Sequence, residues 1–103
     1  MPDYVKVATV ADIPPGAKKI VEVDGVEVVV VNLDGVFHAL EDVCTHDGGP
    51  LGEGALEGCQ LICPRHGARF DVRTGAALTM PAFEPAPTYA VRVQDGDVLV
   101  EAY

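Results

Sequence analysis

Two short groups of residues in the middle of this chain could bind a metal. The first group is Cys44-Thr45-His46, and sixteen residues separate it from the second, Cys63-Pro64-Arg65-His66. Each group offers one thiolate and one imidazole, which bind zinc or iron. A zinc ion usually takes paired ligands that two to four residues separate, and only the second group has that spacing. Because one residue separates Cys44 from His46, this pair reaches two neighbouring metals more easily than one, which favours a two-iron cluster.

These groups resemble the two cluster-binding loops of Rieske-type [2Fe–2S] ferredoxins, in which two histidines replace two cysteines on one iron. The resemblance includes Gly67 after the second group and extends over nearly the whole chain. The four-ligand pattern is its specific part, since turn-forming segments alone occur in many folds. The flanking segments that also carry it are Asp12-Ile13-Pro14-Pro15-Gly16, Asp34-Gly35, Gly49-Pro50-Leu51 and Phe70-Asp71-Val72-Arg73-Thr74-Gly75.

The resemblance implies both a site and a function. Cys44 and Cys63 would hold the inner iron of one [2Fe–2S] cluster. His46 and His66 would hold the outer iron at the surface, where electrons enter and leave. The chain would be an electron carrier and not an enzyme, because the four ligands leave no position open for a substrate. Similar ferredoxins take single electrons from an NAD(P)H-dependent flavoprotein reductase and pass them to a terminal oxygenase that acts on an aromatic ring.

Two alternatives remain open at this stage. A Rieske ferredoxin can serve another pathway, such as iron–sulfur assembly, and the family also includes the small subunit of nitrite reductase. From a different class, two cysteines and two histidines permit a zinc-bound interaction module. Colour separates the two metals, because a Rieske protein is red-brown and gives a rhombic EPR signal after reduction, whereas a zinc protein is colourless.

The chain departs from the respiratory Rieske proteins that it resembles at the ligands. Those proteins carry an extra cysteine in each loop, joined as a disulfide, at places that Gly49 and Arg65 hold here. They also place a serine and a tyrosine after the second loop, where this chain has Ala68 and Phe70. Fewer hydroxyl donors to cluster sulfur leave the reduced state less stabilised. We therefore expect a reduction potential at the low end of the Rieske range, which extends from about −150 to +300 mV.

Three further features need an interpretation. Pro81-Ala82, in the proline-rich stretch 80–87, resembles the loop that covers the cluster in Rieske proteins, and a stiff connector is the alternative. Cys59 is the third cysteine, and we expect a packed or half-exposed thiol. His38 lies within a predicted strand and is interpreted as an ordinary strand residue.

Composition limits the class of protein. The 103 residues are enough for a single domain, 1–103, and 49% are hydrophobic. Sixteen acidic and seven basic residues give a net charge of −9, which argues against binding to nucleic acid. The acidic surface either docks on basic patches of partner proteins or simply keeps the protein in solution. With no apolar run long enough to cross a bilayer and no signal sequence, we expect a soluble, cytoplasmic monomer.

Alternating apolar residues and tight turns predict an all-β fold. Asp24-Gly25, Asp34-Gly35 and Asp95-Gly96 are strong signals for hairpin turns. The run Val28 to Val31 is apolar on both faces, which is typical of a central strand. The expected strands are residues 4–8, 18–23, 26–33, 36–41, 55–56, 60–62, 70–72, 88–94 and 98–102.

This series of short strands favours a small antiparallel β-sandwich or barrel, the Rieske iron–sulfur fold. Residues 1–42 and 68–103 would form its base, and an insert at about 43–67 would carry the cluster. Arg65, Arg69 and Arg73 would either make a positive spot near the cluster or pair with nearby acids.

Overall fold

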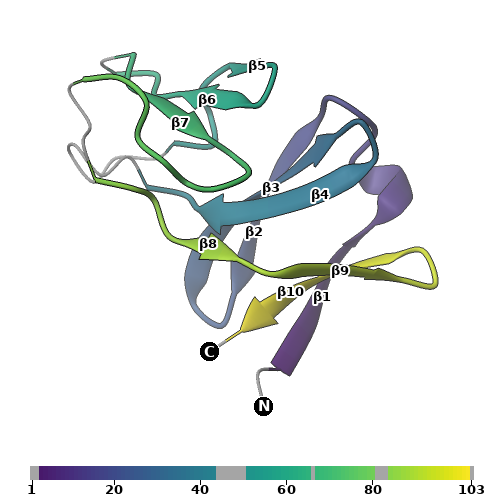
Figure 1. Ribbon diagram of the computed structural model, residues 1–103. Helices are drawn as coiled ribbons and strands as arrows, with labels where there is room; N and C mark the ends of the chain where they lie inside the picture. Colours follow the sequence, from purple (N-terminus) through teal and green to yellow (C-terminus); the bar gives the residue numbers. More distant parts are fainter. Residues whose placement is uncertain (1–2, 44–50, 66, 81–83, 103) are drawn as a thin grey trace.

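A computed structural model describes residues 3–43, 51–65, 67–80 and 84–102 (Figure 1). In this part of the chain, ten strands form three antiparallel sheets, which confirms the predicted all-β fold. None of these residues forms a helix that is long and apolar enough to span a bilayer. The elements are β1 (Asp3–Thr9), the 3₁₀ helix η1 (Val10–Asp12), β2 (Lys18–Val23), β3 (Val26–Leu33), β4 (Val36–Glu41), β5 (Leu56–Glu57), β6 (Gln60–Ile62), β7 (Arg69–Asp71), β8 (Thr88–Tyr89), β9 (Val91–Gln94) and β10 (Asp97–Ala102).

Two of the sheets form the base of the molecule. One has the strand order β2-β3-β4-β8 and the other has the order β1-β10-β9. As predicted, β3 is a central strand with both faces buried. Val28 and Val30 pack in a core with residues of β10, whereas Val29 and Val31 pack in a second core with residues of β6 and β7. Each face of β3 therefore belongs to a separate apolar core.

The three predicted Asp-Gly hairpin turns are present. Asp24, Asp34 and Asp95 have φ angles of 52°, 51° and 53°, and the glycines that follow them have φ angles of 85°, 94° and 80°. Positive φ at both central positions defines the turn type whose twist matches the flanking strands. The turns therefore fix the register of the hairpins, with the pairs Val23↔Val26, Leu33↔Val36 and Gln94↔Asp97.

The third sheet, with strand order β5-β6-β7, lies at the upper left of Figure 1. Leu61 of β6 and Phe70 of β7 are fully buried in one core with Val29 of β3 and Leu40 of β4. The third sheet thus packs on the base through a shared core. It includes β7, which lies beyond the expected insert, and the division into an insert of about 43–67 and a base remains a prediction.

The segment 88–94, predicted as one strand, forms two. β8 pairs with β4 of the first sheet, and β9 pairs with β10 of the second. Between them, the Ala90 carbonyl accepts a hydrogen bond of 2.9 Å from the Glu101 backbone N–H. Because one straight strand cannot pair with both sheets, the chain changes direction here and joins the two sheets of the base.

Candidate metal centre

Of the four predicted ligands, Cys63 lies in the described part of the chain, and Cys44, His46 and His66 lie outside it. Cys63 directly follows β6, is 1% exposed and packs in the core that the third sheet shares with the base. A thiolate shielded from water in this way suits the inner iron of a two-iron cluster. The described residues contain no group of three or more metal-binding side chains, and three of the four predicted ligands lie outside the described residues.

The second loop, residues 63–67, is closed at its base by backbone hydrogen bonds. The Cys63 N–H donates to the Ala68 carbonyl at 2.7 Å, and the Gly67 N–H donates to the Cys63 carbonyl at 3.0 Å. Ala68 and Phe70 are both fully buried. These are the two positions at which respiratory Rieske proteins carry a serine and a tyrosine. In this protein both positions are therefore apolar and enclosed. The donor type, the burial and the small residues of this loop all fit a sulfur-ligated cluster.

Asp42 joins the two ends of the first loop, which is the loop that contains Cys44-Thr45-His46. Asp42 was not identified from the sequence. Its Oδ1 atom accepts hydrogen bonds from the backbone N–H groups of Leu51, at 2.8 Å, and Gly52, at 2.5 Å. Cys44 and His46 lie between these ends in the sequence. One signal in the sequence could have identified Asp42. It is a carboxylate next to a predicted ligand loop, with a glycine just beyond the other end of that loop.

The proline-rich stretch is anchored at both ends beside the second loop. Before it, the Leu78 N–H donates to the Arg69 carbonyl at 2.8 Å, and the Arg69 N–H donates to Thr79 Oγ1 at 3.0 Å. Near its other end, the N–H of Ala86 donates to the Gly75 carbonyl at 2.8 Å. Pro81 and Ala82 themselves lie outside the described residues, so their covering role remains a prediction.

An ion pair occupies the turn after β7. The Arg73 guanidinium donates to both oxygens of Asp71, with Nε–Oδ1 and Nη2–Oδ2 distances of 3.1 and 2.9 Å. The Arg73 backbone N–H also donates to Oδ1, at 2.8 Å. The side-chain hydrogen bond from Arg73 lowers the pKa of Asp71, and burial of the carboxylate opposes this effect. The same bond raises the pKa of Arg73.

His38 is a strand residue, as interpreted, and lies in β4 opposite Val31. The face of β3 and β4 that carries Val31 packs against the third sheet. The pKa of His38 is lowered, first by burial and then by the positive charge of Arg73, while the negative charge of Asp71 acts in the opposite direction. His38 therefore belongs to the contact between the base and the third sheet.

Arg69 and Arg73, which lie near the second loop, pair with acidic side chains. Arg69 Nη1 lies 3.2 Å from Glu57 Oε1 and 3.1 Å from Gln60 Oε1, and Arg73 pairs with Asp71. For these two residues, pairing with nearby acids describes the structure better than an isolated positive spot.

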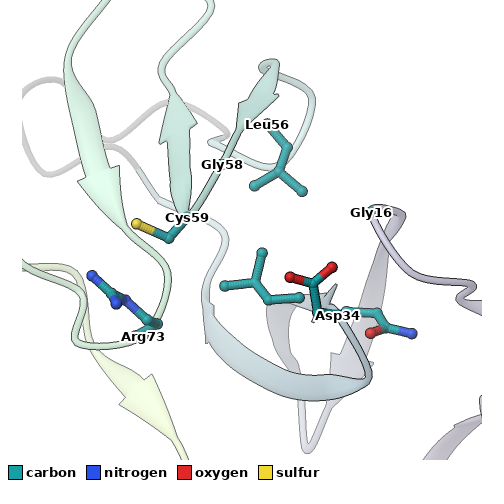
Figure 2. Close-up of a pocket in the computed structure, with 8 residues that line it drawn as sticks. Gly16, Asp34, Leu56, Gly58, Cys59 and Arg73 are labelled. Carbon is teal, nitrogen blue, oxygen red and sulfur yellow. The ribbon is translucent and has the colours of Figure 1, made fainter.

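A cavity of about 500 Å³ lies between the β3–β4 turn and the β5–β6 turn (Figure 2). Leu33 and Leu56 are among the residues that line it. In Figure 2, Asp34 lies on one side of it, and Cys59 and Arg73 lie on the other. Cys59 is a free, half-buried thiol, as expected. Cys63 does not line this cavity, so the cavity is separate from the described part of the candidate metal centre.

Residues 3–90 match the Rieske [2Fe-2S] domain, and the chain belongs to this family. It is 34% identical over 99 residues to the ferredoxin component of the naphthalene 1,2-dioxygenase/salicylate 5-hydroxylase systems of Ralstonia sp, with 96% of this chain and 95% of the relative covered. The ferredoxin of carbazole 1,9a-dioxygenase from Nocardioides aromaticivorans IC177 has a similar structure, with a TM-score of 0.93, 35% identity, and coverage of 97% of this chain and 98% of that chain.

A solved complex of reduced oxygenase and oxidized ferredoxin in carbazole 1,9a-dioxygenase also contains a similar chain. The TM-score is 0.90 and the identity 35%, with 95% of this chain and 92% of that chain covered. These findings confirm the predicted Rieske fold, the predicted [2Fe–2S] cofactor and the resemblance to ferredoxin components of dioxygenase systems. The family cofactor favours the iron–sulfur cluster over a zinc ion.

Proposed function

We propose that the protein carries single electrons from an NAD(P)H-dependent flavoprotein reductase to the terminal oxygenase of an aromatic-ring dioxygenase system. The observation that supports this most directly is the similarity to a chain solved in a complex of reduced oxygenase and oxidized ferredoxin. The similarity covers 92% of that chain.

The proposal includes the four ligands. Cys44 and Cys63 would bind the inner iron, and His46 and His66 the outer iron. When bound, the cluster would accept and release one electron at a time. The burial of Cys63 supports its assignment to the inner iron, because a buried thiolate is protected from water and oxidants.

The hydrogen bonds at the base of the loops also support a carrier. A loop fixed at both ends changes little in shape when the charge of its metal changes. The Cys63–Ala68 bond and the two bonds to Asp42 provide such fixation. Within this proposal the protein performs no substrate chemistry, since its four ligands fill the protein positions on the two irons.

The remaining expectations belong to the same proposal. The protein would act as a monomer in the cytoplasm, and the free thiol of Cys59 suits a reducing compartment. The net charge of −9 suits partners with basic docking patches. A Rieske ferredoxin of another pathway would share the fold and the cofactor, so only the partners separate these functions.

Reconstitution tests the proposal. The purified protein is mixed with NADH, a candidate reductase and an oxygenase with its aromatic substrate, and product is measured with and without the protein. We expect product only when the protein is present. Reduction of the cluster by the reductase without any transfer to ring-hydroxylating oxygenases would contradict the proposed acceptor.

A matched pair of cysteine variants tests the site. Cys63→Ser should lose the visible absorbance and the rhombic EPR signal, because a hydroxyl is a poor ligand for iron. Cys59→Ser should keep both, because Cys59 lies at the separate cavity. Retention of a normal cluster by Cys63→Ser would contradict the ligand assignment.

A further inference from the structure

We infer that Asp42 and Lys18 form a clamp on the Leu51–Gly52 segment, and that this clamp positions the first cluster loop on the base. The inference rests on the proposed function, because it concerns the loop that contains the proposed ligands Cys44 and His46. It assigns to Asp42 and Lys18 a positioning role, with no contact to iron.

The clamp holds the Gly52 residue from two sides. Asp42 Oδ1 accepts the N–H groups of Leu51 and Gly52, at 2.8 and 2.5 Å. Lys18 Nζ donates to the Gly52 carbonyl oxygen at 2.5 Å. Hydrogen bonds in which one partner is charged are shorter and about twice as strong as neutral ones. All three contacts are of this kind, so they fix the backbone at residue 52 firmly.

The position of the clamp in the sequence connects it to the ligands. Asp42 lies two residues before Cys44, and Leu51 lies five residues after His46. The bonds to Asp42 therefore join the two ends of the first loop and close it into a ring. Closing the loop reduces the number of conformations that its ligands can adopt in the absence of metal.

Packing attaches this ring to the base. Leu51 is fully buried in the core that also contains Val29. A Cβ atom at Gly52 would lie 2.6 Å from Val29 Cγ2 and 2.9 Å from Ile20 Cγ1, so the backbone there rests directly on β2 and β3. Lys18 belongs to β2 as well. The Leu51–Gly52 segment, which follows the first loop in the sequence, is thus attached to β2 and β3 of the base.

Two substitutions of Asp42 separate hydrogen bonding from charge. Asp42→Asn retains a carbonyl oxygen that can accept both N–H groups, whereas Asp42→Ala removes the acceptor. We expect Asp42→Ala to lose its cluster to a chelator at least about tenfold faster than the wild type, which corresponds to 1.4 kcal/mol. Asp42→Asn should remain within about twofold of the wild type, because one lost charge weakens the bonds without removing them. Lys18→Met should fall between the two, because it loses one of the three contacts.

Asp12→Ala is the matched control. Asp12 Oδ2 accepts a hydrogen bond of 3.0 Å from the Thr9 backbone N–H, outside both predicted ligand loops. Removal of this carboxylate should leave the rate of cluster loss unchanged. The rate is followed by bleaching of the visible bands at a temperature at which far-UV circular dichroism shows that every variant is folded.

The EPR spectrum gives a readout that general destabilisation would not move. We expect shifted g values in Asp42→Ala and wild-type values in Asp42→Asn and Asp12→Ala. If Asp42→Ala is purified folded but without a cluster while Asp42→Asn retains it, the result supports the clamp. The clamp is overturned if Asp42→Ala matches the wild type, or if Asp42→Asn loses the cluster as fast as Asp42→Ala. A wild-type protein without iron would instead overturn the proposed function.

Discussion

Gly75 allows a test of how the turn after β7 supports the proline-rich stretch. Its φ angle is 78°, and a Cβ atom there would lie 2.1 Å from the Ala86 carbonyl oxygen. Gly96 is the natural control, because its φ angle is 80° and nothing lies within 4 Å of a Cβ atom at that position. Gly75→Ala and Gly96→Ala therefore share the same backbone strain, and only Gly75→Ala adds a collision.

The two costs can be estimated separately. An alanine in the left-handed region costs about 1–2 kcal/mol, and this is the whole expected effect of Gly96→Ala. Ordinary contact begins near 3.4 Å, so in Gly75→Ala the Ala86 carbonyl must move by more than an ångström. This movement breaks the 2.8 Å bond from the Ala86 N–H to the Gly75 carbonyl. A buried hydrogen-bonding group left without a partner costs about another 1–3 kcal/mol.

Thermal unfolding of the cluster-loaded proteins, at one protein concentration and one heating rate, measures the difference. For a domain of this size, 1 kcal/mol shifts the midpoint by about 4–8 °C. We expect Gly75→Ala to unfold at least about 4–8 °C below Gly96→Ala, and to bleach first as well. Equal midpoints for the two variants would refute the reasoning, since they would show that the contact with Ala86 contributes nothing.

Three further predictions concern a histidine, the cluster environment and the shared core. The lowered pKa of His38 means that the unfolded chain binds its proton more readily, so stability should fall as the pH drops below about 6.5. His38→Gln should flatten this decrease between pH 7.5 and 5.5 in thermal unfolding relative to the wild type, and an unchanged slope would contradict the assignment. The midpoint reduction potential should lie near the low end of the Rieske range, at about −150 mV. Phe70→Tyr, which adds a hydroxyl group, should raise this potential in a redox titration. A clearly positive wild-type potential would contradict the prediction. Leu61→Ala should lower the free energy of unfolding by about 2–5 kcal/mol. Leu78, which is 44% exposed, is the control, and Leu78→Ala should cost less than about 0.5 kcal/mol by chemical denaturation. Similar losses would show that the shared core does not determine stability.

The strands were predictable from the sequence because local rules determine them. The three Asp-Gly pairs require positive φ, and they set the registers of their hairpins without help from distant residues. Val28 to Val31 likewise indicated a strand buried on both faces. The break at Ala90 was not predictable, because the segment 88–94 has an uninterrupted strand pattern. The segment divides because its first part pairs with β4 and its second part pairs with β10.

The cofactor was predictable from the sequence, but the residues that support the proposed site were not. Ligand types and spacing indicated a two-iron cluster, and the family confirms that cofactor. Asp42 was missed because its role depends on where Leu51 and Gly52 return in space, nine and ten residues later. Asp71 was missed as a binding partner of Arg73 because an acid two residues from an arginine has no special meaning until a tight turn brings them together.

The position of Cys63 explains why the cluster-binding part of the chain depends on the base. This residue belongs to the same core as Val29, Val31 and Leu40, which lie on the two central strands of the base sheet. The third sheet alone has strands of two or three residues, too short to bury a core by itself. Cys63, the proposed inner ligand, therefore acquires its buried position only when the third sheet packs on β3 and β4. It follows that a change in the base, such as Val31→Ala, should accelerate cluster loss, although it lies in a strand that carries none of the proposed ligands.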